Sequence, residues 1–183
     1  MINKQNVRDR IEYLLNNSDL ATADLGKRER NDGRKSYHPN CHGTVIFSLQ
    51  KEGIINLMNT EGYRTPKFLQ NGLGWIDGLI MANFLREYCT ETKPDNSEIV
   101  SFWAERKDNI PVLQHTGIFV PWMFEGNQEQ IFNQLNTGGK FCFININEYK
   151  TGLEREVPEM GFIINNSVIR MKPGVRINYH CIK

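Results

Sequence analysis

The hydrophobic pattern of the chain changes period about halfway along. Near the N-terminus, the apolar positions at helical spacing are Val7, Ile11, Leu14 and Leu15. This spacing predicts a short helix there. A second helix is expected just after Asn40, a good N-cap, and before Gly53, a good stop signal. A third is expected over residues 76–88, after a Gly-rich turn.

From residue 98 onward, short segments are predicted to form β-strands, and several of them have alternating apolar and polar residues. The expected strands are 98–103, 116–120, 130–136, 141–146, 161–164, 168–171 and 175–179. Turn signals such as Gly138-Gly139 and Pro173-Gly174 separate them. Helices followed by a run of antiparallel strands predict an α+β fold rather than a βαβ chain. We expect one domain over residues 1–183, with a motif-bearing core at about 37–149 and C-terminal strands at 160–183.

Composition and charge narrow the choice of function. The chain has 183 residues, 22 Lys plus Arg and 21 Asp plus Glu, for a formal net charge of +1. Such balance argues against a nucleic-acid partner. No apolar run is long enough for a membrane span, and the first ten residues lack the apolar core of a secretory signal. We therefore expect a protein that is cytoplasmic as synthesised, with export by a signal-independent route left open.

Among the four cysteines, Cys41 has the most informative position. No pair has C-x-x-C spacing, so mostly free thiols and no metal or other cofactor are expected. Cys41 directly follows the N-cap Asn40, where first-turn N–H groups and the helix dipole stabilise negative charge. A thiol there tends toward thiolate, which is the nucleophilic form. The other three alternate with apolar neighbours and are expected in the core: Cys89, Cys142 and Cys181.

His115 is the candidate base. It precedes the apolar segment 116–120 and is expected at the start of that strand, from which it could reach a helix N-terminus. A surface or strand-edge histidine is the alternative interpretation. A zinc site built from Cys41-His42 and His180-Cys181 is disfavoured, because adjacent residues point in different directions.

Three segments together resemble the NlpC/P60 group of papain-like cysteine peptidases. Residues 40–45 (NCHGTV) are similar to its D-C-S-G-F-V nucleophile segment. Residues 97–102 (SEIVSF) are similar to its G-D-I-V-x-F strand, and residues 115–119 (HTGIF) to its H-V/A-G-I-Y strand. They occur in the order of the family, over about residues 40–149. The resemblance implies N-terminal helices packed on an antiparallel sheet, with Cys41 as nucleophile and His115 as base.

The resemblance also implies a polar third residue on the next strand, which orients the base. The segment 130–139 occupies that place, and the family pattern matches Asn133 best, with Gln134 one position away. A shift of one residue moves a side chain to the other face of the strand, so the two alternatives stay open. Tyr37 is the one tyrosine close upstream of Cys41, and His42 replaces the usual Ser. Together with Trp122, beyond the His115 strand, they are the candidate substrate-binding residues.

The activity implied is a cysteine-dependent amide hydrolysis, with a peptide or a bacterial cell-wall amide as substrate. Two alternatives remain. One is a catalytically silent domain of the same fold that binds a peptide or partner. The other is an effector toxin of the deamidase or acyltransferase type, for which an inhibitor or immunity partner is expected.

Overall fold

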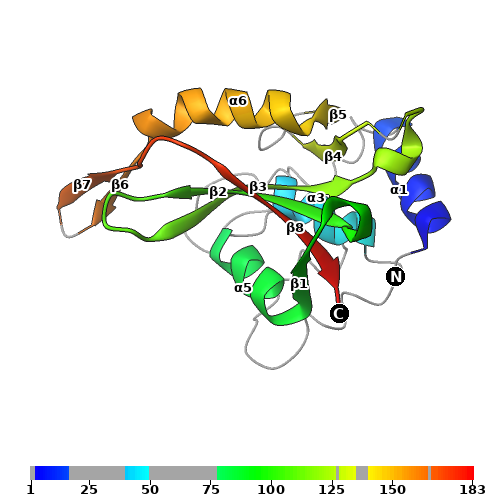
Figure 1. The fold of residues 1–183 in the computed structure, drawn as a ribbon, viewed down its shortest axis with the longest axis horizontal. Coiled ribbons are helices and arrows are strands. Elements are labelled where there is room, and N and C mark those ends of the chain that lie inside the picture. Colours follow the sequence, from blue (N-terminus) through cyan, green and yellow to red (C-terminus); the bar gives the residue numbers. More distant parts are fainter. Residues whose placement is uncertain (1–2, 17–39, 50–77, 127, 135–139, 165) are drawn as a thin grey trace, which may run out of the picture.

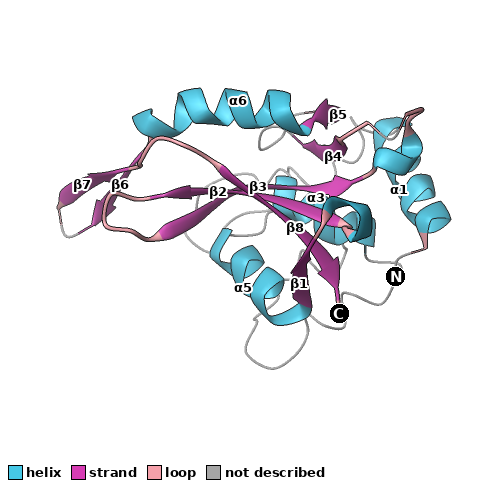
Figure 2. Cartoon of the chain, viewed as in Figure 1, coloured by secondary structure: helices cyan, strands magenta, loops and turns pink. Residues whose placement is uncertain are grey.

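The computed structural model describes residues 3–16, 40–49, 78–126, 128–134, 140–164 and 166–183. In chain order the elements are α1 (Lys4–Asn16), α3 (Cys41–Leu49), α5 (Gly78–Tyr88), β1 (Cys89–Thr92), η3 (Pro94–Asn96), β2 (Ile99–Glu105), β3 (Pro111–Phe119), η4 (Pro121–Met123), β4 (Gln130–Gln134), β5 (Phe141–Asn145), α6 (Ile146–Glu156), η5 (Val157–Glu159), β6 (Gly161–Ile164), β7 (Ser167–Arg170) and β8 (Arg176–Ile182). The mixture of helices and antiparallel strands confirms the α+β class (Figure 2).

A six-stranded antiparallel sheet in the order β1-β8-β2-β3-β4-β5 forms the centre of the fold. The last strand, β8, lies between β1 and β2 and pairs with both, so the C-terminal segment is an integral part of the sheet. β3 pairs with β2 along its length but with β4 only at Ile118 and Phe119. Strands β6 and β7 form a separate hairpin at one end of the molecule (Figure 1).

The two faces of the sheet are covered by different helices. Alternate residues of a strand point to opposite faces, so Ile99 and Val100 on β2 belong to different apolar clusters. The cluster with Ile99 includes buried residues of α1, α3 and α5, whereas the cluster with Val100 includes Leu153 of α6. Figure 1 shows the same arrangement, with α6 across one side of the sheet and α3 and α5 on the other.

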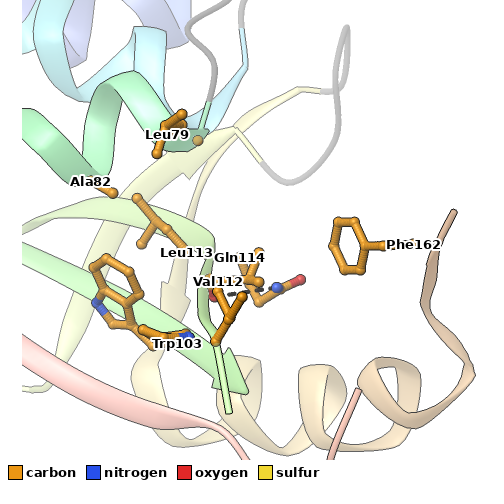
Figure 3. Close-up of a pocket in the computed structure, with 10 residues that line it drawn as sticks. Leu79, Ala82, Trp103, Val112, Leu113, Gln114 and Phe162 are labelled. Carbon is orange, nitrogen blue, oxygen red and sulfur yellow. Dashed lines mark hydrogen bonds between the residues drawn. The ribbon is translucent and has the colours of Figure 1, made fainter. Parts of the chain in front are cut away.

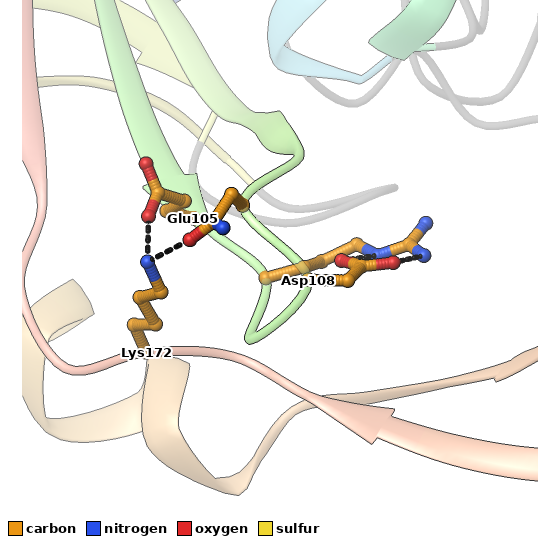
Figure 4. Close-up of polar contacts among 5 residues, drawn as sticks. Glu105, Asp108 and Lys172 are labelled. Carbon is orange, nitrogen blue, oxygen red and sulfur yellow. Dashed lines mark hydrogen bonds and ion pairs between the residues drawn. The ribbon is translucent and has the colours of Figure 1, made fainter.

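The β2–β3 turn is tied to the segment that leads into β8. Lys172 Nζ contacts the carboxylate of Glu105 and lies 2.5 Å from Asn109 Oδ1 (Figure 4). Asn109 adopts a positive φ of 66°, as expected for a tight turn residue. Arg106 pairs with Asp108 in the same turn. The contacts of Lys172 join the turn to the C-terminal segment, although exposed ion pairs of this kind each add little stability.

Most predicted elements are present, with four differences. The N-terminal helix and the helix after Asn40 are confirmed, although Leu15 is 37% exposed rather than buried and Gly53 lies outside the described residues. The start of the third helix at residues 76–77 also lies outside them.

β1 and α6 were not predicted. β3 begins at Pro111, so His115 lies within the strand and not at its start. No helix in the described part of the chain is long and apolar enough to cross a bilayer.

Candidate functional site

Cys41 begins helix α3, as the sequence predicts. The Oδ1 atom of Asn40 accepts a hydrogen bond from the Gly43 N–H at 2.9 Å, and its carbonyl accepts one from the Thr44 N–H at 2.9 Å. These bonds satisfy backbone donors that a helix start leaves without partners. Val45, Ile46 and Leu49 are buried against the sheet and anchor the helix. The cap and the buried stripe therefore fix the position of Cys41.

His115 lies on β3, opposite Phe102 of β2, and is only 2% exposed. Residues directly opposite in an antiparallel pair share one face of the sheet, so His115 points to the face that α6 covers. Its ring lies 4.4 Å from the ring of Tyr149 on α6 and 5.9 Å from that of Phe102, measured between centroids. Two aromatic rings thus hold the imidazole in place.

Cys41 and His115 line one cavity of about 270 Å³. Its lining residues are Asn40, Cys41, His42, Gln114, His115, Gln134, Tyr149, Leu153, Glu156 and Met160. The cavity draws residues from α3, β3, β4 and α6, elements that are far apart in the sequence. The two residues predicted to react therefore line the same cavity.

Burial, not the helix start, dominates the acidity of Cys41. Loss of solvent raises the pKa of its thiol from 9.0 to about 11. The backbone N–H groups of Thr116, His42 and Cys41 face the sulfur and partly offset this rise. The expectation of an acidified thiol is therefore wrong for the free protein, because desolvation outweighs the stabilisation by N–H groups. Cys41 is a protonated thiol at neutral pH in this state.

Burial has the corresponding effect on His115 and lowers the pKa of its imidazole from 6.5 to about 3. The nearby His42 adds to this decrease, and the Asn133 side chain opposes it. The ring atom Nε2 is buried and has no hydrogen-bond partner among the described residues. In this state no hydrogen bond joins Cys41 Sγ to His115 among the described residues. His115 is thus a neutral imidazole in the lining of the cavity.

Asn133 and Gln134 lie on opposite faces of β4, and the structure separates their surroundings. Asn133 shares the α6 face with His115, since its neighbour Ile131 packs in the cluster with α6. The Asn133 side chain raises the pKa of His115, so the two side chains are close together. Within the described residues, however, the Oδ1 and Nδ2 atoms of Asn133 make no hydrogen bond of ordinary geometry. Gln134 faces the other way, toward the cluster that contains Phe132, and lines the cavity. The side-chain placement therefore favours Asn133 as the neighbour of His115.

His42 links the cavity to β3. Its Nδ1 atom lies 2.8 Å from the Thr116 hydroxyl and 3.6 Å from Cys41 Sγ. The His42 side chain is 5% exposed, and its imidazole is in contact with the Cys41 sulfur. Because Thr116 already engages Nδ1, His42 holds the helix start against the sheet and is a wall of the cavity. Its predicted role in substrate binding stays a prediction.

Trp122 and Tyr37 are the other two predicted substrate-binding residues. Trp122 lies on η4, past the far end of β3, where the charged groups of Lys4 and Arg8 on α1 approach its ring at 5.9 and 5.8 Å. It is not among the residues that line the cavity, and its predicted role in substrate binding stays a prediction. Tyr37 lies outside the described residues.

Tyr149 is a member of the site that the sequence analysis missed. It lines the cavity beside His115, and burial together with the Cys41 charge raises the pKa of its phenol. The helix that carries it had a readable signal. Asn145 caps α6 by accepting from the N–H groups of Asn147 and Glu148, and Ile146 and Leu153 form its buried stripe. An apolar stripe after an Asn cap could have predicted this helix.

The described residues include no group of three or more His, Cys, Asp or Glu side chains that could hold a metal ion. No protein-family model matches the chain, and the searches of curated proteins and of solved structures gave no match either. The function must therefore be argued from the site alone.

Proposed function

We propose that this protein is a cysteine-dependent amide hydrolase in which Cys41 is the nucleophile and His115 the base. The observation that carries the proposal is that a thiol at a helix start and a buried imidazole with an unpartnered Nε2 line one cavity. Buried polar atoms nearly always have a partner, so an imidazole nitrogen left without one beside a cavity fits a group that acts on a substrate.

Both groups are neutral in the free protein, which determines the order of events. As Cys41 Sγ attacks the amide carbonyl, an S–C bond forms, the C=O π electrons move to oxygen, and the thiol proton passes to His115. First-turn N–H groups of α3 are candidate donors to the oxyanion. The tetrahedral adduct then breaks its C–N bond, and His115 returns the proton to the leaving amine. Water, deprotonated by His115, cleaves the thioester and restores the thiol.

The absence of a Cys41–His115 hydrogen bond in the free state is compatible with this scheme. Catalytic hydrogen bonds are often long before substrate binds and tighten in the complex. Asn133 is proposed to orient His115, since it shares a face of the sheet with it. A peptide or cell-wall amide is the proposed substrate, and the NlpC/P60-like, papain-type fold is proposed on the same three motifs.

The test compares wild type with Cys41→Ala on purified cell-wall fragments and a general peptide panel. We expect the variant to lose product formation by a factor of about 10³ or more, because the nucleophile is removed. Cys181→Ala is the matched control, since Cys181 is also a partly buried free thiol but lies on β8. Equal product from wild type and Cys41→Ala would exclude this mechanism. Release of ammonia from a glutamine peptide, or acyl transfer to an added amine, would identify the deamidase or acyltransferase variant.

A further inference from the structure

A second cavity, of about 440 Å³, lies beside the candidate catalytic cavity. Its lining residues are Gly78, Leu79, Ala82, Trp103, Ile110, Pro111, Val112, Leu113, Gln114 and Phe162. They come from the start of α5, the first half of β3 and the β6–β7 hairpin, with Phe162 facing α5 across the space (Figure 3). The lining is almost entirely apolar, and a volume of this size is typical of a small-ligand site.

Gln114 lines both cavities. The β2–β3 register shows why: Phe102 pairs with His115 and Trp103 with Leu113, so Gln114 is an extra residue in a β-bulge. A bulge turns the side chain of its extra residue away from the regular alternation, and such bulges are frequent next to active sites. The Gln114 amide donates to the Val112 carbonyl at 3.3 Å, which holds it between the two spaces.

Gly78 provides a second connection. A Cβ atom placed on Gly78 would lie 3.3 Å from the Leu113 carbonyl and 3.7 Å from His42 Nε2. Gly78 thus lines the apolar cavity while almost touching His42, whose neighbour in sequence is Cys41. The apolar cavity therefore adjoins the candidate catalytic cavity at Gln114, which lines both, and reaches His42 at Gly78.

The edge of β3 next to this cavity suits an extended chain. Between Pro111 and Gln114, β3 pairs with β2 on one side, and among the described residues β4 pairs with the other side from Ile118 onward. Extended peptides bind such strand edges through their backbone, while pockets receive alternate side chains. Two large apolar side chains at the cavity are also exposed, Leu79 at 70% and Ile110 at 47%. Exposure of this kind at a cavity is typical of a binding site.

We propose that this apolar cavity is the specificity subsite of the hydrolase. It receives a bulky apolar side chain, such as Leu or Phe, from a peptide residue next to the scissile amide. The inference rests on the proposed function and adds the substrate class, because it requires Cys41 to react in the neighbouring cavity. A charged side chain would lose its hydration here without gaining a partner, so the subsite discriminates against Lys and Glu.

The test measures alkylation of Cys41 by iodoacetamide and by N-(2-phenylethyl)iodoacetamide at pH 9, read by mass spectrometry of the Cys41 peptide. In both reactions the sulfur forms an S–C bond, iodide leaves with the C–I electrons, and the thiol proton passes to solvent. Rates are divided by those of the same reagents with glutathione. We expect the phenylethyl reagent to be at least ten times faster than iodoacetamide after this correction, because its ring enters the apolar cavity.

Two variants and one control make the result specific. Ala82→Phe fills the cavity, and Leu79→Ser removes an apolar wall at an exposed position that does not endanger the fold. Both should reduce the preference to within about threefold of unity while the iodoacetamide rate stays unchanged. Ile163→Ser, at a residue 79% exposed on β6 and outside the cavity lining, should keep the wild-type preference.

The outcomes separate the two proposals. Equal corrected rates for the two reagents in wild type would overturn the subsite, even if Cys41 hydrolyses amides. A preference that Ala82→Phe and Leu79→Ser both leave intact would overturn it as well. Clear selectivity at Cys41 without hydrolysis of any amide would keep the subsite and overturn the hydrolase. Failure of Cys41 to react with either reagent would overturn both.

Discussion

His115 and His180 are two buried histidines of the same sheet with opposite surroundings. His115 on β3 is 2% exposed and His180 on β8 is 4% exposed, and burial lowers the pKa of both. His180 Nε2 lies 2.6 Å from Ser101 Oγ, which also accepts a hydrogen bond from Trp103 Nε1 at 2.7 Å. His115 Nε2 has no partner in the described part of the chain, and His115 lines the candidate catalytic cavity.

This difference is the one expected between a structural histidine and the base that we propose. A buried polar atom without a hydrogen bond costs about 1–3 kcal/mol, so selection for stability alone would replace it. His180 does not carry this cost at Nε2, because Nε2 is within hydrogen-bond distance of Ser101 Oγ. Ser101 Oγ is held in turn by the hydrogen bond from Trp103 Nε1. His115 carries it next to a thiol. Retaining an unsatisfied group at a cavity is typical of sites where function opposes stability.

The largest expected effect comes from making the same substitution at both positions. His115→Phe should reduce kcat/KM by a factor of about 10³, because the base is lost. It should leave the free energy of unfolding unchanged or raise it by about 1 kcal/mol, since Phe fits between Phe102 and Tyr149 and removes an unsatisfied nitrogen. His180→Phe should keep activity within a few-fold but lower the free energy of unfolding by about 1–3 kcal/mol.

The measurements are urea unfolding at pH 7.5 and steady-state kinetics on the substrate found with the Cys41→Ala test. Activity is expressed per folded molecule, so that a weakened fold does not imitate a catalytic loss. Full activity in His115→Phe would remove the base from the mechanism. A destabilised His115→Phe with an undisturbed His180→Phe would reverse the comparison and make His115 the structural residue.

A smaller effect is expected at Asn133, which we propose to orient His115. Asn133→Leu removes the amide from the α6 face of β4 with little change in shape, and it should lower kcat about 10- to 100-fold with little change in KM. Gln134→Met, on the opposite face, is the matched control, since both residues are completely buried. It should change kcat by less than about threefold. A larger loss of kcat in Gln134→Met than in Asn133→Leu would assign the orienting role to Gln134.

Sequence patterns predicted most of the fold because local signals were strong. The α1 stripe and the Asn40 cap specify their helices without help from distant residues. The properties of the site were harder to predict, because they depend on packing between elements that are distant in the sequence. The sequence could place Cys41 at a helix start but not show that burial would raise its pKa. The choice between Asn133 and Gln134 likewise required the strand face, which the structure supplies.

The missed helix α6 illustrates a different limit. Its Asn145 cap and its apolar residues Ile146 and Leu153 were present in the sequence, but they followed a strand-like run and preceded two more. Once α6 is in place, Tyr149 closes the cavity over His115. The extra β-bulge residue Gln114 had no local signal at all, because a bulge is defined by the partner strand.

The smallest expected effect is a pH dependence of stability that separates the two histidines again. The pKa of His115 is about 3 in the folded state and near 6.5 when unfolded, so the unfolded chain binds the proton first. Above pH 6.5 both states are neutral at this group and stability is constant. As the pH falls from 6.5 toward 3, protonation of the unfolded chain lowers the free energy of unfolding by up to about 1.4 kcal/mol per pH unit.

Urea unfolding of wild type and His115→Phe at pH 7.5 and pH 5 measures this contribution. Wild type should lose about 2 kcal/mol more than the variant between these two pH values. His180→Phe should also flatten the profile, because burial lowers the pKa of His180, but Glu91 opposes that shift and makes the effect smaller. Parallel profiles for wild type and His115→Phe would show that His115 gains a proton as readily when folded as when unfolded. The imidazole would then be solvated or paired with a Cys41 thiolate, and the attack would begin from an ion pair rather than from two neutral groups.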